Sequence, residues 1–219
     1  LLAMSDWSGG LLGYLMNANV NPSILFGDLS KADDFAKARA LVHIDTGVNS
    51  PRTLRLLKAA VSGGRGVLNF ISDATACAVQ SDTAKLPCGK SSLVPPHGPG
   101  IAPKYMFHVS EAGHLKPAAG QGVHTVMFRG RAPMFAYDLT GFPNCRGILF
   151  WNGHTVGYSC QTKNGDFVQI GAPLFSDYNS GDYGRILDSS QLEWFMKGLL
   201  KKLEVRPLVK LSKEADQTV

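Results

Sequence analysis

The 219-residue sequence predicts an α/β fold with a mostly parallel sheet, and two observations in its first 72 residues lead to that prediction. Short apolar runs alternate with segments of helical spacing, beginning and ending on a strand. The run ALVHI at 40–44 is continuous, as parallel strands buried on both faces tend to be. Strands and helices that alternate in this way form right-handed crossovers, and the helices cover both faces of the sheet.

Local signals place the elements of this first half. A helix over 30–38 is predicted to start at a Ser30 cap and to carry acidic residues in its first turn. The helix over 50–62 has the clearest signals, because Ser50 can cap it, a proline suits its first position and Gly63-Gly64 end it. The remaining predicted elements of this half are strands at 1–4, 24–26 and 66–71 and a helix over 7–19.

The second half is organised differently. Residues 73–122 are rich in proline, glycine and serine and lack a periodic pattern, so we expect an irregular insertion there. Short strands are predicted at 122–128 and 132–139. Asn164-Gly165 is a strong hairpin signal between two further strands, because both residue types tolerate a positive φ. An amphipathic helix over 189–203 follows the hairpin.

Composition and charge bound the possible classes of protein. One domain over 1–205 with a polar tail over 206–219 suits the length, and 44% hydrophobic residues are enough for a sizeable core. No apolar stretch approaches the roughly 20 residues that span a bilayer. The net charge of +5 is scattered, apart from basic residues that suit the C-terminal end of the last helix. We therefore predict no membrane or nucleic-acid partner, and we leave the localisation open. Because the chain opens on Leu1, we expect a piece of a longer polypeptide.

The cysteines and histidines do not match a metal-site pattern. The four cysteines form no CxxC pair, and the histidine spacings match no ligand motif such as HExxH, so we predict no metal and no cofactor. Two disulfides, Cys77–Cys88 and Cys145–Cys160, and four free thiols remain as alternatives.

Three stretches carry a resemblance to a known superfamily. They are ALVHIDTG at 40–47, LLKAAVSGGRGVL at 56–68 and NGDFVQIGAPLF at 164–175. With the order of the elements, they resemble the class I glutamine amidotransferase-like superfamily, over roughly 1–75 and 145–203. The likeness is closest to its non-catalytic members, the trimerisation domain of bacterial β-galactosidases and the ThuA-like domains. The resemblance implies a flavodoxin-like three-layer sandwich, and it indicates fold more directly than activity.

Catalytic members of this superfamily carry a cysteine on a sharp turn directly after the fourth strand, in a G-x-C-x-G context. Here that region reads FISDATACA, in which Cys77 comes several residues late and without flanking glycines. Ser72 lacks the G-x-S-x-G elbow that exposes a nucleophilic serine. The glycines at 63–66 follow a helix and precede a strand, the reverse of a phosphate site at a helix N-terminus. We predict no catalytic residue, with Cys77 and Ser72 as the alternatives.

Binding residues are predicted at strand ends and in aromatic loops. Asp45 and Asp73 follow predicted strands, as Asp6 and Asp28 do, and ligands of open α/β sheets bind outside the carboxyl ends of the strands. Helix capping and turn formation are the alternative roles for these carboxylates. His43 lies within an apolar strand, which favours a satisfied core histidine over a base. Aromatic residues predicted to make contacts or to stack on a sugar are Trp7, Trp151, Tyr158, Phe175, Tyr178 and Tyr183, with a core role favoured for Trp151.

These observations favour a non-catalytic domain that mediates oligomerisation or partner binding within a larger carbohydrate-active or assembly protein. Its expected partners are a second copy of the chain or domains of the parent protein, and carbohydrate is a further possibility. One alternative is a hydrolase or amidotransferase-like enzyme that uses Cys77 or Ser72. The other is a structural subunit of a complex of different proteins.

Overall fold

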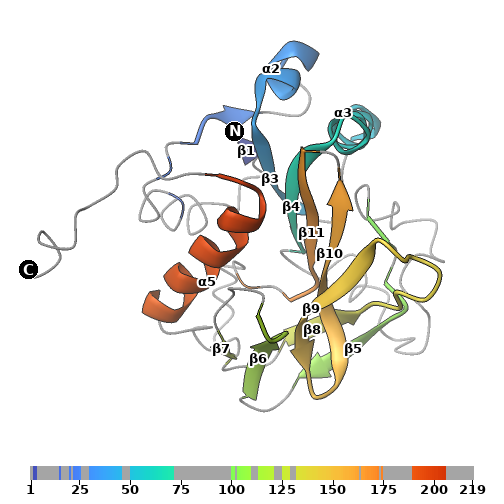
Figure 1. The fold of residues 1–219 in the computed structure, drawn as a ribbon, viewed down its shortest axis with the longest axis vertical. Coiled ribbons are helices and arrows are strands. Elements are labelled where there is room, and N and C mark those ends of the chain that lie inside the picture. The colour runs from blue at the N-terminus through green and yellow to red at the C-terminus, as the bar shows by residue number, and fades with distance from the viewer. Residues whose placement is uncertain are drawn as a thin grey trace, which may run out of the picture.

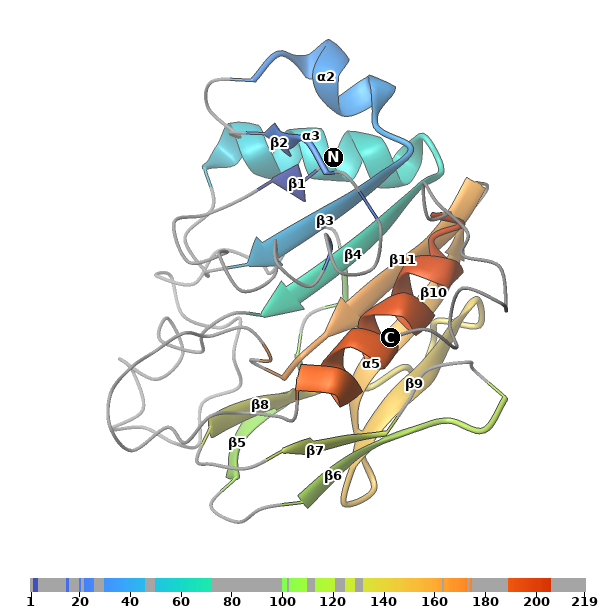
Figure 2. The same ribbon diagram turned by 90° about the vertical axis from the view of Figure 1, so that its left-hand side faces the viewer.

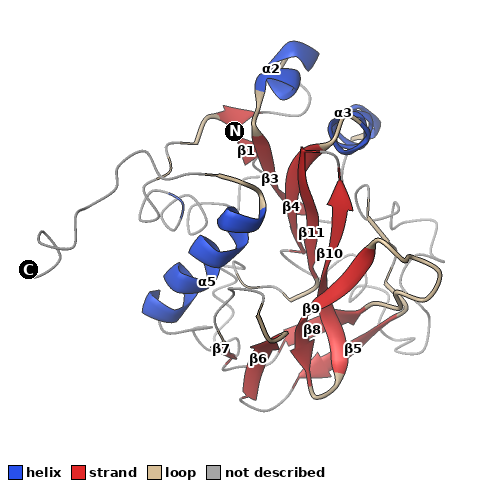
Figure 3. Cartoon of the chain, viewed as in Figure 1, coloured by secondary structure: helices blue, strands red, loops and turns tan. Residues whose placement is uncertain are grey.

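The structure is a computed structural model, and it describes residues 2–3, 15, 20, 22–25, 30–45, 50–71, 100–101, 103–109, 113–120, 125–128, 132–162, 164–172, 174 and 189–205. Strands dominate these residues, and helices are fewer (Figure 3). The helices longer than one turn are α2 (Ala32–Lys37), α3 (Pro51–Ser62) and α5 (Ser189–Lys202).

Most strands belong to one large mixed sheet. They are β1 (Leu2–Ala3), β2 (Ile24–Leu25), β3 (Ala40–Asp45), β4 (Arg65–Ile71), β6 (Gly113–Pro117), β7 (Val126–Phe128), β9 (Cys145–Trp151), β10 (His154–Thr162) and β11 (Asn164–Ile170). Their order across this nine-stranded sheet is β2-β1-β3-β4-β11-β10-β9-β6-β7 (Figure 1). The strands β5 (Tyr105–Val109) and β8 (Ala132–Ala136) form a separate antiparallel pair.

The sheet has a parallel half and an antiparallel half. The four pairings from β2 to β11 are parallel, and the four from β11 to β7 are antiparallel. The prediction of an α/β fold is confirmed, whereas the prediction of a mostly parallel sheet holds for the first half alone. The reason is that tight turns join successive strands from β9 to β11, and a tight turn reverses the chain direction.

Helices α3 and α5 lie on opposite faces of the sheet (Figure 2). Because side chains alternate along a strand, each strand contributes to two cores. Leu41 and Val67 belong to the core that holds Leu57 of α3. Their neighbours Val42 and Leu68 belong to the core that holds the buried side chains of α5, which are Phe195, Met196, Leu199 and Leu200.

The helix caps agree with the sequence at one site and differ at another. Ser50 caps α3 as predicted, since its Oγ accepts a hydrogen bond from the Thr53 N–H at 3.1 Å. The predicted Ser30 cap of α2 is wrong. Lys31 occupies the N-cap position, and its backbone N–H donates to the Asp34 carboxylate at 3.0 Å, so the acidic side chain closes the first turn.

The predicted irregular insertion at 73–122 contains two strands, β5 and β6. Tyr105, Phe107 and Val109 alternate along β5 and are good strand formers, which the surrounding prolines and glycines obscured in the sequence. The predicted hairpin is confirmed, with Thr162 of β10 opposite Gly165 of β11.

Candidate functional site

A row of polar side chains crosses three neighbouring strands of the parallel half. His43 of β3 pairs in register with Asn69 of β4, which pairs with Gln169 of β11. All three point to the face that α3 covers, because each stands two residues beyond a member of that core: Leu41, Val67 and Phe167. The row lies one or two residues before the carboxyl ends of its strands, which are Asp45, Ile71 and Ile170.

Side-chain hydrogen bonds join the three residues. The His43 Nδ1 lies 2.6 Å from the Asn69 Oδ1, and the Asn69 Nδ2 donates to the Gln169 Oε1 at 2.7 Å. The side chains are almost completely buried, with exposed fractions of 4% for His43, 0% for Asn69 and 1% for Gln169. Buried polar groups are costly unless they are hydrogen-bonded, so these bonds keep the row compatible with the core.

The far end of the row is incompletely satisfied. The Gln169 Nε2 has no hydrogen-bond partner among the described residues, although an amide nitrogen can donate two hydrogen bonds. Tyr158 of β10 pairs in register with Gln169. The ring of Tyr137 packs edge-on against the ring of Tyr158, with 4.9 Å between the ring centroids. Gly171 is needed beside them, because a Cβ there would lie 2.7 Å from the Tyr137 ring and from the Phe135 carbonyl oxygen.

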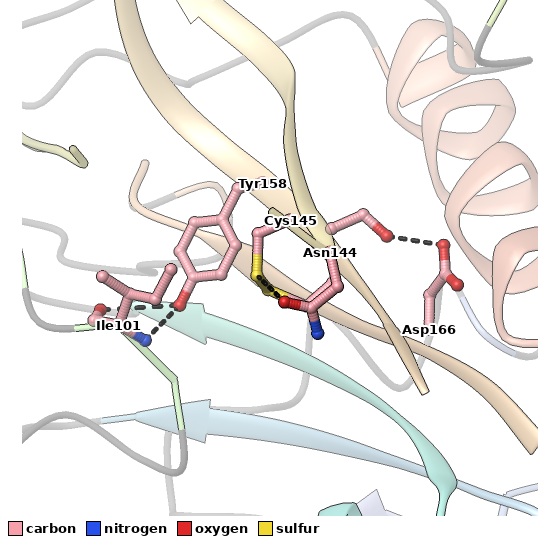
Figure 4. The surroundings of a disulfide bond; sticks show 7 residues. Ile101, Asn144, Cys145, Tyr158 and Asp166 are labelled. Carbon is pink, nitrogen blue, oxygen red and sulfur yellow. Dashed lines mark hydrogen bonds between the residues drawn. A yellow bond between two sulfur atoms is a disulfide. The ribbon is translucent and has the colours of Figure 1, made fainter. Parts of the chain in front are cut away.

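Tyr158 connects the sheet to residues 100–101, within the predicted insertion at 73–122 (Figure 4). Its hydroxyl oxygen accepts a hydrogen bond from the Ile101 N–H at 2.5 Å. Burial raises the pKa of the Tyr158 phenol well above its usual range, so the hydroxyl stays neutral. Gly100 is in close contact as well, since a Cβ there would clash with the Tyr158 hydroxyl oxygen. Tyr158 therefore fixes the chain at 100–101 on the sheet.

A second polar group lies on the face that α5 covers. The Ser159 Oγ donates to the Asp166 carboxylate at 2.5 Å across β10 and β11 (Figure 4). Lys202, at the C-terminal end of α5, has its pKa lowered by burial and then by the positive charge of Arg146, while Asp166 opposes the shift. Opposite charges meet here at the margin of the core, and a structural role accounts for them.

The disulfide Cys145–Cys160 joins β9 and β10 directly, with the two residues opposite each other in register (Figure 4). It is one of the two disulfides that the sequence allowed. Cys77 and Cys88, the other possible pair, lie outside the described residues. The sulfurs of Cys145 and Cys160 are not available as metal ligands or nucleophiles while they are bonded.

Of the binding residues predicted from the sequence, Asp45 is the one whose backbone is described. It is the last residue of β3 and pairs with Ile71, the last residue of β4, so the carboxyl ends of the two strands lie side by side. The other predicted residues fall outside the described ranges: Trp7, Ser72, Asp73, Cys77, Tyr178 and Tyr183. Trp151 is buried, as predicted, and His43 is a hydrogen-bonded core histidine, as predicted. The prediction of Tyr158 as a contact residue is wrong, because its side chain is completely buried in the core on the α3 side of the sheet. Phe175 lies outside the described residues.

Asn69 and Gln169 were not predicted as functional residues. The available signal was a single polar residue within each apolar strand, in VLNFI and FVQIG. An amide at a position that must be buried requires a partner, and two such strands beside ALVHI could have indicated one shared network.

Metal and membrane sites were sought within the described ranges. There, no group of three or more His, Cys, Asp or Glu side chains could hold a metal ion. None of the described helices is both long and apolar enough to cross a membrane.

Neither the family models nor the curated proteins that were searched contain a match to this sequence. Solved structures do match. The β-galactosidase from Rahnella sp. R3 superposes with a TM-score of 0.61 at 9% identity, over 94% of this chain and 28% of that protein. The β-galactosidase from Bacillus circulans sp. alkalophilus gives 0.59 at 10% identity, with the same two coverages.

A smaller protein is also similar. The cytoplasmic protein STM1381 from Salmonella typhimurium LT2 gives a TM-score of 0.54 at 13% identity, over 91% of this chain and 88% of that protein. The chain thus spans little more than a quarter of the length of the β-galactosidases but nearly the whole of the Salmonella protein. The expected resemblance to a segment of bacterial β-galactosidases is confirmed as a likeness of fold.

Proposed function

We propose that this chain is a non-catalytic α/β domain that associates with itself or with neighbouring domains of a larger carbohydrate-active or assembly protein. The observation that carries the proposal is the coverage of the structural matches. Nearly all of this chain corresponds to a segment of about a quarter of each β-galactosidase. A domain that occurs as a segment of larger proteins has neighbours to contact.

A flavodoxin-like three-layer sandwich is the finer description of fold that we propose for the parallel half. The parallel strands follow the order β2-β1-β3-β4-β11, which corresponds to the order 2-1-3-4-5 of flavodoxin-like sheets. Helices on both faces, α3 on one and α5 on the other, support the same description (Figure 2). The antiparallel strands β10, β9, β6 and β7 would then be an extension of that sandwich.

The chemistry of the described residues supports a binding role over catalysis. Near the carboxyl ends of β3, β4 and β11, the polar row offers one imidazole and two amides. Neither a thiol nor a hydroxyl belongs to this row as the structure describes it. Amides and an imidazole that is hydrogen-bonded to them suit hydrogen bonding to a ligand or to another side chain better than they suit nucleophilic attack.

Sedimentation velocity of the full chain over a range of concentrations tests the self-association. We expect a discrete oligomer, most simply a trimer, that dissociates on dilution. A monomer at all concentrations would contradict self-association. In that case, binding to a separately expressed domain of the parent protein would support the alternative role as a structural subunit of a complex of different proteins. The absence of such binding would contradict that alternative as well.

The enzyme alternative is tested separately with Cys77→Ala and Ser72→Ala. The assay is hydrolysis of a chromogenic ester and a chromogenic glutamine amide by the full chain. We expect no turnover above the rate of a heat-denatured sample, in either variant or in the original chain. Turnover that disappears in one of the two variants would overturn the non-catalytic proposal.

A further inference from the structure

The disulfide Cys145–Cys160 lies beside the apolar core on the α3 side of the sheet. Cys160 packs against this core, which contains Tyr158 and Phe167. Cys160 stands two residues after Tyr158 on β10, so the two side chains point to the same face, and it pairs in register with Phe167 of β11. Both cysteines are partly exposed, as the disulfides that thiols reduce tend to be.

The rings of Tyr158 and Phe167 also hold residues 100–101 on the sheet. The Ile101 N–H donates to the Tyr158 hydroxyl oxygen at 2.5 Å, and Ile101 packs against the same core as Cys160. Gly100 lies on the Phe167 ring, since a Cβ there would lie 2.7 Å from a ring carbon. The disulfide and residues 100–101 therefore share two supporting side chains, whose ring centroids are 6.1 Å apart.

Reduction of the disulfide would disturb that support. Two thiol groups cannot stay at bonding distance, because unbonded atoms repel one another inside their van der Waals contact. The Cys160 side chain or its strand must therefore shift, and Tyr158 and Phe167 belong to the core against which it packs. Close-packed interiors transmit such shifts, and the hydrogen bond from Ile101 depends on the position of the Tyr158 hydroxyl.

We propose that the Cys145–Cys160 disulfide is a redox-sensitive restraint, and that its reduction by a dithiol loosens the attachment of residues 100–101 to the sheet. One thiolate of the dithiol attacks the Sγ of one cysteine, and the other cysteine leaves as a thiolate and takes up a proton. The second thiol of the dithiol then displaces the first cysteine. The two cysteines gain two electrons and two protons, and the dithiol becomes a disulfide. The proposal concerns contacts within one chain, so it stands or falls separately from self-association.

The first measurement uses the full chain with Cys77→Ser and Cys88→Ser, which leaves Cys145 and Cys160 as its cysteines. NMR follows the hydrogen exchange of the Ile101 amide before and after reduction with dithiothreitol, and mass spectrometry after alkylation verifies that both thiols are free. We expect exchange about tenfold faster in the reduced chain, because this N–H is held by its hydrogen bond to Tyr158. The amides of β3 and β4 should keep their rates. An unchanged rate at Ile101 would overturn the proposal.

A second test needs no reductant and keeps Cys77 and Cys88. In the full chain with Cys145→Ser and Cys160→Ser, the Ile101 amide should exchange at the rate of the reduced chain. An Ile101 rate equal to that of the oxidised original chain would show that the attachment does not depend on the disulfide, and the proposal would be wrong.

Two tyrosine variants test the route through Tyr158. Tyr158→Phe keeps the ring and removes the hydroxyl, so the Ile101 amide should already exchange fast in the oxidised chain, and reduction should accelerate it little further. Tyr105→Phe is the matched control, because the Tyr105 hydroxyl is hydrogen-bonded to His154 instead, and this variant should respond to reduction as the original chain does. An equal acceleration by reduction in both variants would contradict the role of Tyr158.

Discussion

The parallel and antiparallel halves of the sheet are held together in different ways. In the parallel half, neighbouring strands are distant in the sequence, and side chains such as Asn69 and Gln169, 100 residues apart, meet across them. In the antiparallel half, β9, β10 and β11 follow one another directly, and Cys145 and Cys160 are 15 residues apart. Long-range burial stabilises the first region, while short turns and a covalent bond stabilise the second.

The two halves also differ in how far apart in the sequence their buried contacts are. Hairpins and the disulfide restrain the antiparallel half locally, in addition to the buried side chains, such as Leu149 and Val156, that it contributes to the shared core. The parallel half places the ends of several distant segments side by side, which lets a few buried polar groups converge. The polar row is found in that half.

The largest expected effect is the loss of a core side chain beneath α5. Phe70 is completely buried in the core that β4 shares with Val156 of β10 and with α5. We expect Phe70→Ala to lower the free energy of unfolding by about 4 kcal/mol, through lost burial and the cavity that remains. Urea unfolding measures it, and both halves should still unfold in one transition because they share this core.

The matched control for that change is Phe142→Ala, since Phe142 is 43% exposed. It should alter the free energy of unfolding by about 0.5 kcal/mol or less. A comparable loss in both variants, or separate transitions for the two halves, would contradict a shared core.

The next effect separates the two amides of the row. Asn69→Leu leaves the His43 Nδ1 and the Gln169 Oε1 without this hydrogen-bond partner, and each unsatisfied buried group costs about 1–3 kcal/mol. Gln169→Leu disrupts one of these bonds and also removes the Nε2 that has no partner among the described residues. Thermal or urea unfolding should therefore show the larger loss for Asn69→Leu. Equal losses of stability would mean that the two hydrogen bonds of Asn69 contribute no more than the one hydrogen bond of Gln169.

The sequence predicts the elements that have local signals, and it does not predict the contacts between distant strands. Helix α3 and strands β3 and β4 were predicted within a residue or two, because caps and apolar runs are local. The β9–β10 turn was missed although Asn152-Gly153 signals it, with φ of 45° and 83°. The contacts of Asn69 with His43 and Gln169 depend on strand order and register, which single-strand patterns do not contain.

The third effect concerns the covalent link of the antiparallel half. Replacing both Cys145 and Cys160 by serine should lower the free energy of unfolding by at most about 3 kcal/mol, the value for closing a loop of this length. The hairpin turn already restrains the same strands, which reduces the loss. Amide hydrogen exchange should increase in β9 and β10 and remain unchanged in β3 and β4. Faster exchange in β3 and β4 would show that the disulfide also supports the parallel half.

The smallest expected effect is a pH dependence at Asp138, in the segment after β8. Hydrogen bonds from Thr140, and then from the Lys104 ammonium 3.1 Å away, lower the pKa of the Asp138 carboxyl from 3.8 to about 2. A group whose pKa is lower in the folded state stabilises the protein above its unfolded pKa, and the contribution is lost as the pH falls through the folded value. The loss should therefore occur between about pH 4 and pH 2, and it should be small because the side chain is 44% exposed.

A ¹³C titration of the carboxyl carbon measures the pKa of Asp138, and Asp138→Asn should remove this part of the pH dependence. A titration midpoint near 3.8 would mean that Thr140 and Lys104 do not hold the carboxylate in solution, and the segment after β8 would then lack this local restraint.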